Sequence, residues 1–239
     1  GNWVTYTSES TNLLPTDTNG TVADVFLRDL QQETVALVSV AVGASGAEGN
    51  GSSFDTTIST DGRYVAFTSS AYNLIPDDTN GVWDVFVYDR QDLTTTRVSV
   101  ASDGAEGNES SERSTISADG RYVAFQSLAR NFAAGDDNGA MDIFVRDRLT
   151  NTTTLVSRTA AGGVGNGPST APAISDGGRY VAFISAANNL VAGDTNGQPD
   201  VFVYDRDTHA MQLVSRASGP DGALGDRTSD IRRLAISAD

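Results

Sequence analysis

The chain has no cysteine and no lysine among its 239 residues, and it has one histidine. The absence of cysteine excludes disulfides and thiolate metal sites, although it does not identify the cellular compartment. No stretch approaches the ~18–20 consecutive apolar residues that a membrane-spanning helix requires, so we expect no membrane insertion. The sequence does not begin with methionine and shows no signal peptide, so we expect a mature or excised form.

Positive charge is also scarce. Sixteen basic residues stand against 31 acidic ones, which gives a formal net charge of −15 at pH 7. Nucleic acids and anionic membranes bind basic protein faces, so neither is an expected partner. This charge is typical of a cation-binding or highly soluble exported protein, and we expect an extracellular or periplasmic, secreted location.

Helical periodicity is absent as well, because no window repeats its apolar residues at helical spacing. The 24 glycines and the short apolar runs, rich in β-branched and aromatic residues, are typical of a turn-rich β protein. With 38% hydrophobic residues the chain can bury a sizeable core. We therefore predict one all-β domain over residues 1–239.

One segment of the sequence recurs at a spacing of about 58 residues. Its copies are Asp61–Phe67, Asp119–Phe125 and Gly177–Phe183. A fixed period in this range indicates a solenoid, a propeller or an array. The repeat phase favours a single domain over two.

A fourth copy of the repeat is divided between the two ends of the chain. Ile236–Asp239 matches the start of the repeated segment, and Gly1–Ser8 matches its continuation. A repeat split in this way favours a ring, because pairing of the termini completes one unit and removes the open sheet edges. We therefore expect Leu234–Ser237 to pair with Trp3–Thr7 in one sheet.

Each repeat predicts four short strands joined by turns and loops. The template strands are Ser114–Ser117, Arg121–Phe125, Asp84–Asp89 and Thr95–Val100. Four antiparallel strands in sequence form one blade of a β-propeller. The four repeats therefore predict a β-propeller with four blades of four antiparallel strands, closed by pairing of the N- and C-terminal strands.

The run Ile116–Phe125, followed by Asp142–Asp147, resembles the TolB-type (WD-like) β-propeller repeat. That family repeats a Ser-x-Asp-Gly turn, an apolar strand and a strand that ends in Asp. The resemblance covers nearly the whole chain and implies the propeller fold. It implies little about activity, because such repeats occur in binding, scaffolding and peptidase-associated proteins. The period here exceeds the ~40–45 residues typical of a blade, so the loops are longer.

Part of the added length is a loop with the pattern Asp-x-Asn-Gly-x-x-Asp, which occurs three times. Calcium takes six to eight oxygen ligands, and side chains at positions 1, 3 and 7 with a backbone carbonyl at 5 supply such oxygens. We therefore predict Ca²⁺ as the cofactor. The predicted ligands are Asp78, Asn80, Val82 and Asp84; Asp136, Asn138, Ala140 and Asp142; and Asp194, Asn196, Gln198 and Asp200.

Turn formation alone is the alternative interpretation of these loops, because Asn-Gly and Asp-Gly are common turn dipeptides. It does not require the Asp at position 7, and clustered carboxylates without a cation would repel one another. The first copy of the loop has one extra residue before its last Asp. Its predicted ligands are Asp17, Asn19, the Thr21 carbonyl and Asp24, and we expect it to be the weakest or most distorted site.

Each repeat is joined to the next by a long connecting loop of another kind, which contains Gly-Asn or Gly-Asp. Its copies are Ala47–Asn50, Glu106–Asn108, Val164–Asn166 and Leu224–Asp226. In an up-and-down blade, alternate loops emerge on alternate faces. Both kinds of long loop therefore share one face, and loops on a rigid scaffold commonly carry function.

Two further sets of residues recur in every complete repeat. We interpret the arginines Arg63, Arg121 and Arg179 and the aspartates Asp89, Asp147 and Asp205 as repeated structural ion pairs. Catalysis, in contrast, requires several different groups that converge on one point. The single histidine, His209, lies in a predicted exposed turn. Nothing singles out Glu106, Glu109 or Glu112 as a pair for glycoside cleavage, so we assign no catalytic residue.

Three functional hypotheses follow. The first is a secreted, calcium-stabilised propeller that acts as a binding or interaction module for a protein or a surface polysaccharide. The second is a structural subunit that self-associates into an extracellular surface array or filament. The third is a carbohydrate-binding or glycan-processing propeller, for which the stacking aromatics Trp83 and Tyr72 are few and are not repeated.

Overall fold

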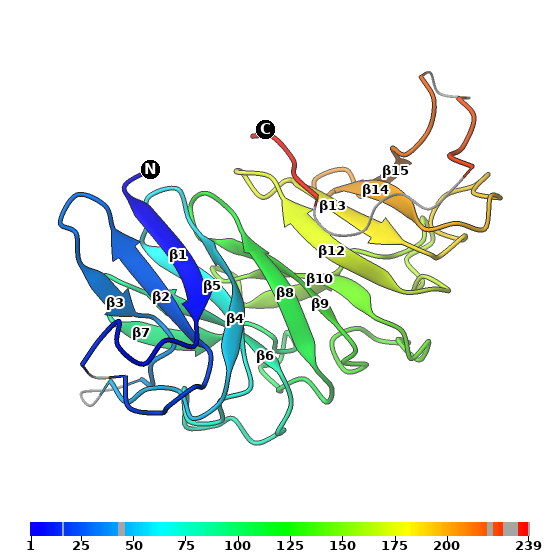
Figure 1. Cartoon of the computed structure of the whole chain (residues 1–239). Coiled ribbons are helices and arrows are strands. Elements are labelled where there is room, and N and C mark those ends of the chain that lie inside the picture. Colours follow the sequence, from blue (N-terminus) through cyan, green and yellow to red (C-terminus); the bar gives the residue numbers. More distant parts are fainter. Residues whose placement is uncertain (16, 43–45, 219–221, 227–233, 239) are drawn as a thin grey trace.

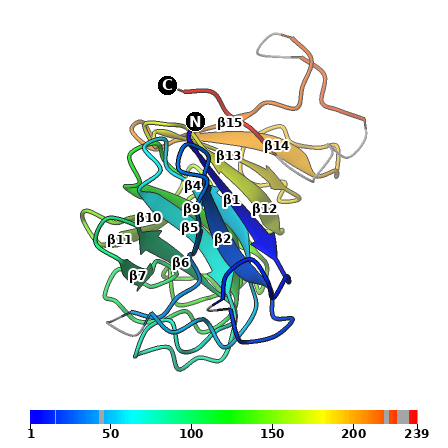
Figure 2. The same ribbon diagram turned by 60° about the vertical axis from the view of Figure 1, so that its left-hand side comes forward.

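The structure is a computed structural model that describes the chain except for residues 16, 43–45, 219–221, 227–233 and 239. The described residues form fifteen β-strands and no helix. The predicted all-β class is confirmed, with one strand fewer than four blades of four strands require. None of the described segments could therefore cross a membrane as a helix. The strands build four antiparallel sheets, numbered here 1 to 4 in chain order. The sheets follow one another along an open arc (Figure 1; a second view in Figure 2).

Sheet 1 has three strands and the other three sheets have four each, in the order of the chain. Sheet 1 contains β1 (Trp3–Ser8), β2 (Asp24–Asp29) and β3 (Val35–Leu37). Sheet 2 contains β4 (Ser53–Ile58), β5 (Tyr64–Ser69), β6 (Asp84–Asp89) and β7 (Thr94–Arg97). Sheet 3 contains β8 (Ser111–Ile116), β9 (Tyr122–Ser127), β10 (Asp142–Asp147) and β11 (Thr152–Leu155). Sheet 4 contains β12 (Ser169–Ile174), β13 (Tyr180–Ser185), β14 (Asp200–Asp205) and β15 (Ala210–Leu213).

The same aromatic pair lies at the centre of every sheet. In sheet 3 the strand register places Phe125 opposite Phe144, and the two rings stack with their centroids 6.0 Å apart. Equivalent stacked pairs in the other sheets have centroids 5.7–5.8 Å apart. Between neighbouring sheets, the apolar faces form three buried clusters, and β-branched residues such as Val85 and Val87 pack against the next sheet. The repeated sequence thus produces a core between successive sheets.

A glycine in the turn before the second strand of sheets 2, 3 and 4 packs against an aromatic ring of the preceding sheet. Gly120 of sheet 3 lies so close to Tyr64 of sheet 2 that a Cβ atom there would be 2.0 Å from the ring. Arg148 of sheet 3 covers the same ring, with its guanidinium carbon 4.4 Å from the ring centroid, and donates to the Gly120 carbonyl. Gly178 with Tyr122, and Gly62 with Trp3, repeat this contact. Sheets 2, 3 and 4 therefore each pack a turn against an aromatic side chain of the sheet before them.

The predicted structural ion pairs are confirmed. Arg63 contacts Asp89 at 2.7 Å, Arg121 contacts Asp147 at 2.8 Å and Arg179 contacts Asp205 at 2.7 Å. Each pair joins the turn that precedes the second strand of a sheet to the end of the third strand. The side chains of these arginines are about one-third exposed, so we assign the pairs to the scaffold.

The predicted closure of the ring is not formed in this structure. Residues 234–238 belong to no strand, so sheet 1 has three strands and β1 is an unpaired edge. Leu234 instead lines a cavity of about 210 Å³ beside bulged residues of the first strands of sheets 2 to 4, among them Thr56, Ser114 and Pro172. In this open arc the described C-terminal residues 234–238 lie beside sheet 4 in Figure 1 and do not pair with β1.

Candidate metal centre

The two kinds of long loop meet on one face, as predicted. In sheet 1 the backbone N–H of Thr18 donates to both carboxylate oxygens of Glu48, at 2.8 and 3.0 Å. In sheet 2 the N–H of Thr79 donates to Glu106 at 3.1 Å in the same way. In sheets 1 and 2, a glutamate of the loop that leaves the sheet thus accepts hydrogen bonds from the Asp-x-Asn-Gly loop of the same sheet.

The Asp-x-Asn-Gly loops are numbered here from first to fourth, in the order of sheets 1 to 4. The last Asp of each loop begins the following strand and is buried. Asp84 accepts a hydrogen bond from the Ser99 hydroxyl at 2.5 Å and one from the Asn80 amide nitrogen at 2.8 Å. Its counterparts Asp24, Asp142 and Asp200 accept equivalent bonds from a serine and an asparagine. These bonds hold the loop on the sheet. They therefore give the repeated Asp a structural role, which turn formation alone did not explain.

The Asn at position 3 differs between the first loop and the others. In the second, third and fourth loops its side-chain oxygen accepts the N–H of the residue two positions later, from Val82, Ala140 and Gln198 respectively, at 2.7–3.1 Å. Thr21, at the corresponding place in the first loop, is exposed. There the extra residue removes this bond, and the Asn19 side-chain oxygen is buried without a partner. The extra residue therefore changes the geometry of the first loop and leaves there an amide oxygen that the other three loops use for their own turn. This argues against the expectation that the first loop is the weakest site.

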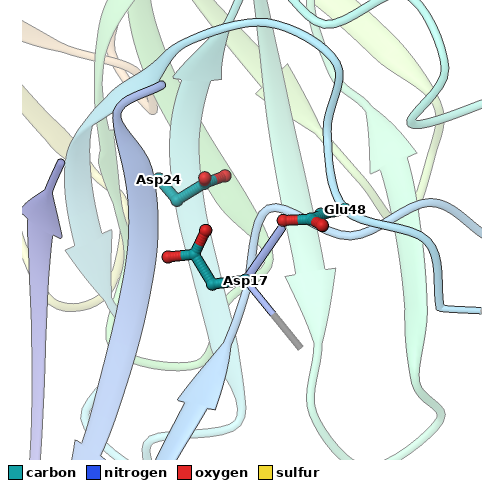
Figure 3. A group of neighbouring side chains, drawn as sticks. All are labelled: Asp17, Asp24 and Glu48. Carbon is teal, nitrogen blue, oxygen red and sulfur yellow. The ribbon is translucent and has the colours of Figure 1, made fainter. Parts of the chain in front are cut away.

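The first loop assembles three carboxylates. One oxygen each from Asp17, Asp24 and Glu48 lies within 4.8 Å of the others, and this is the one such group of three among the residues that the structure describes (Figure 3). Asp17 and Asp24 are buried, and the Oδ1 atom of Asp17 has no hydrogen-bond partner. Burial raises the pKa of Asp17, and the charge of Glu48 raises it further. A cation at this point would reverse that effect and would satisfy the unpartnered oxygens.

The second loop has three equivalent carboxylates, and a guanidinium lies among them. Nη1 of Arg97 is 2.8 Å from Glu106, 3.3 Å from Asp78 and 3.5 Å from Asp84. Burial would raise the pKa of Glu106, but hydrogen bonds from Thr79 and the Arg97 charge lower it. The pKa of Asp78 is raised to about 6, first by burial. One arginine therefore compensates only part of the charge.

At the positions equivalent to Asp17, Asp24 and Glu48, the third and fourth loops have two carboxylates each. The residue that pairs in the position of Glu48 and Glu106 is Val164 in sheet 3 and Leu224 in sheet 4. Burial raises the pKa of Asp142 to about 6 and also raises the pKa of Asp136 and of Asp194. The Oδ1 atom of Asp194 is buried without a partner. With one carboxylate fewer at the ligand positions, these two loops should bind calcium more weakly than the first loop. The predicted ions there, and the carbonyl ligands Val82, Ala140 and Gln198, are untested by the structure.

Sequence reasoning missed two of the residues that distinguish these loops. Glu48 and Arg97 lie in loops and strands other than the Asp-x-Asn-Gly segment, so the spacing within that segment could not reveal them. A signal was present in the aligned repeats. Arg97 stands before Val-Ser where the other repeats have leucine, and Glu48 precedes Gly-Asn where the third repeat has Val164.

The described residues offer no converging catalytic group around the candidates considered. His209 lies in the exposed turn before β15, as predicted, and its Nδ1 atom is 2.8 Å from the Tyr204 hydroxyl. Glu112 accepts a hydrogen bond from Gln126, and Glu106 belongs to the Arg97 cluster. Among the aromatic candidates, Tyr72 is exposed and Trp83 packs on Phe54 with the ring centroids 4.7 Å apart.

Comparison with known proteins identifies the architecture. No family model matches the chain, and no curated protein matches it. A candidate TolB from Agrobacterium tumefaciens matches with a TM-score of 0.54 at 16% identity, over 89% of this chain and 61% of that chain. The β-propeller domain of the Trilobed protease from Pyrococcus furiosus matches with a TM-score of 0.50 at 10% identity, over 90% of this chain and 54% of that one. The fold is that of a β-propeller.

An acylaminoacyl peptidase also matches, with a TM-score of 0.51 at 12% identity, over 89% of this chain and 30% of that chain. At these identities the similarity shows the fold alone. The predicted resemblance to TolB-type repeats is confirmed at that level, and each of sheets 1 to 4 is one propeller blade. The chain spans about three-fifths of the TolB protein and about half of the Trilobed protease domain.

Proposed function

We propose that this β-propeller is an interaction module stabilised by one Ca²⁺ ion bound at the first loop. The observation that carries the proposal is the group of Asp17, Asp24 and Glu48, which brings three carboxylates together with a buried, unpartnered oxygen on Asp17. Buried carboxylates without a compensating cation are unfavourable, since each burial penalises the charged form. A divalent ion removes that penalty at this site.

The donor set favours calcium over other cations. All of the candidate ligands are oxygens: three carboxylates and the side-chain oxygen of Asn19, which is buried without a partner. Calcium accepts six to eight oxygen ligands in flexible geometry, whereas magnesium prefers a tight octahedral shell and keeps its waters. Loops of extracellular modules bind calcium at about 10⁻⁴–10⁻³ M. We therefore propose that the protein is secreted into a compartment that contains calcium.

The interaction role is supported by the scaffold and its charge. The long loops of each sheet lie together on a rigid β frame, which is where binding surfaces are commonly built. The net charge of −15 favours a partner that carries basic groups or binds through calcium. A protein or a surface polysaccharide fits this description.

Calcium should raise the thermal stability of the metal-free protein. At ten times its Kd, one ion that binds only the folded state stabilises by about 1.4 kcal/mol, which corresponds to roughly 3–6 °C in Tm for a chain of this size. We expect this shift in wild type, and we expect Asp17→Asn and Glu48→Gln to abolish it. Differential scanning calorimetry with calcium, magnesium or excess chelator measures it.

Asp136→Asn is the matched control, because Asp136 occupies position 1 of the third loop and is also buried. This variant should keep the calcium shift, and magnesium should give little shift in any variant. An identical melting curve with calcium and with chelator, on protein shown to be metal-free, would refute the proposal.

We also propose that the C-terminal segment completes sheet 1. The segment matches the end of β8 in sequence, and β1 has an unpaired edge with Val4 exposed. The register of β8 with β9 pairs Ile116 with Val123, which by the repeat corresponds to Ile236 opposite Val4. The alternative is self-association into an array, in which the same edge pairs with another copy.

A double-cysteine variant distinguishes these arrangements, because the natural chain has no cysteine. Directly opposed residues in adjacent antiparallel strands lie within reach of a disulfide. Val4→Cys with Ile236→Cys should form an intramolecular disulfide on mild oxidation, detected by mass spectrometry and non-reducing electrophoresis. Val4→Cys with the exposed Leu149→Cys is the control. Disulfide-linked oligomers in place of the intramolecular product would support the array, and free thiols would contradict both.

A further inference from the structure

One position of the sheets distinguishes the second loop from the other three. Arg97 pairs with Phe86 at the end of the fourth strand of sheet 2. The same position, opposite the equivalent phenylalanine, is Leu37 in sheet 1, Leu155 in sheet 3 and Leu213 in sheet 4. The arginine is thus the exception in a register position that is otherwise leucine.

The Arg97 side chain is directed into the second loop and is buried there, with 6% of its side chain exposed. One of its nitrogens, Nη1, contacts all three carboxylates of the loop, from Asp78, Asp84 and Glu106. The other, Nη2, donates to the backbone carbonyl of Asp77 at 3.0 Å. The guanidinium therefore binds both the carboxylates and the backbone of the Asp-x-Asn-Gly loop.

We propose that the Arg97 guanidinium is the resident cation of the second loop and that it excludes calcium from that loop. This inference rests on the proposed function, because it assigns calcium to the first loop alone among the two loops with three carboxylates. The carboxylates correspond one to one, with Asp17, Asp24 and Glu48 in sheet 1 in the places of Asp78, Asp84 and Glu106 in sheet 2. In sheet 1 the arginine is replaced by Leu37, which carries no charge.

The exclusion has steric and electrostatic causes. A calcium ion must lie 2.3–2.6 Å from its oxygen ligands, and in sheet 2 Nη1 already lies 2.8–3.5 Å from the three carboxylates that would have to converge on the ion. A positive charge at that distance also repels the ion. As a consequence, calcium stabilises the loop of the first blade, whereas the guanidinium stabilises the loop of the second blade without the metal.

Exchange of the two residues tests the inference. The variants are Arg97→Leu, which gives sheet 2 the residue of sheets 1, 3 and 4, and Leu37→Arg, which gives sheet 1 the residue of sheet 2. Calcium stoichiometry is measured by isothermal titration calorimetry, and Tm is measured in excess chelator and in calcium. Arg97→Lys keeps the charge and serves as the conservative variant.

We expect wild type to bind one calcium ion at these two loops, Arg97→Leu to bind one more, and Leu37→Arg to bind one fewer. Loss of one partner of a buried charge cluster leaves uncompensated carboxylates, so in chelator Arg97→Leu should melt roughly 10 °C below wild type. Calcium should restore part of that loss. Arg97→Lys should melt close to wild type in chelator and bind no additional ion.

Failure of this inference differs from failure of the proposed function. If Arg97→Leu binds no additional calcium and melts as wild type does in chelator, the guanidinium is not the cation of the second loop and the inference is overturned. If wild type binds no calcium, the proposed function is overturned. In that event, a loss of stability in Arg97→Leu that Arg97→Lys recovers would still establish Arg97 as the resident cation.

Discussion

Replacement of Gly120 by alanine should destabilise the protein by about 3 kcal/mol. The added Cβ atom would lie 2.0 Å from the ring of Tyr64, so the contact between sheets 2 and 3 must open. Overpacking of this kind costs about 1–3 kcal/mol, and the left-handed backbone at Gly120, with φ +73°, costs a further 1–2 kcal/mol once a side chain is present. Urea denaturation monitored by fluorescence gives the difference in unfolding free energy.

Gly104→Ala is the matched control for this prediction. Gly104 also has a left-handed backbone, with φ +89°, but a Cβ there would meet nothing within 4 Å. Its substitution should therefore cost only the backbone component. Equal destabilisation by the two variants would show that the close packing of Gly120 on the Tyr64 ring contributes nothing to the contact between blades.

The second large effect is the contribution of Asp142, which should stabilise the metal-free protein at low pH and should be lost as the pH rises. Burial raises the pKa of Asp142 to about 6, and the nearby charge of Asp136 adds to it, although hydrogen bonds from Ser157 and Asn138 oppose the shift. A carboxyl whose pKa is higher in the folded than in the unfolded state stabilises the fold while it is protonated. That contribution is complete below about pH 4 and is lost as the pH rises through 6.

The expected loss for Asp142 is on the order of 3 kcal/mol, since a tenfold change in a protonation equilibrium corresponds to about 1.4 kcal/mol. The measurement is the unfolding free energy in chelator from pH 4 to pH 7.5, compared between wild type and Asp142→Asn. The asparagine variant loses a hydrogen bond at every pH, so the comparison uses the slope and not the absolute value. Parallel pH profiles for the two proteins would contradict the assignment.

Much of the fold could be predicted from the sequence because the information is local and repeated. The strand Asp84–Asp89 has the predicted bounds, since two aspartates enclose an apolar β-branched and aromatic run. Arg63 and Asp89 are 26 positions apart, yet their recurrence in each repeat indicated that they meet. The shared face of the long loops followed from the alternation of strands.

Other features depend on contacts that the period cannot encode. The predicted pairing of Leu234–Ser237 with β1 requires the curvature of the whole arc to bring the two ends together, and curvature is a property of packing between sheets. The metal ligands were sought within one loop, whereas Glu48 approaches Asp17 from 31 positions away. The role of Arg97 appears only when its neighbours in space, and not in sequence, are known.

We propose above that cations of two kinds hold equivalent loops, a calcium ion in sheet 1 and a guanidinium in sheet 2. Anomalous diffraction from crystals grown with saturating calcium tests it most directly. We expect a calcium peak bounded by Asp17, Asp24 and Glu48, with oxygen ligands at about 2.3–2.6 Å. We expect no peak among Asp78, Asp84 and Glu106. An empty first loop, or an ion in the second loop of wild type, would contradict it.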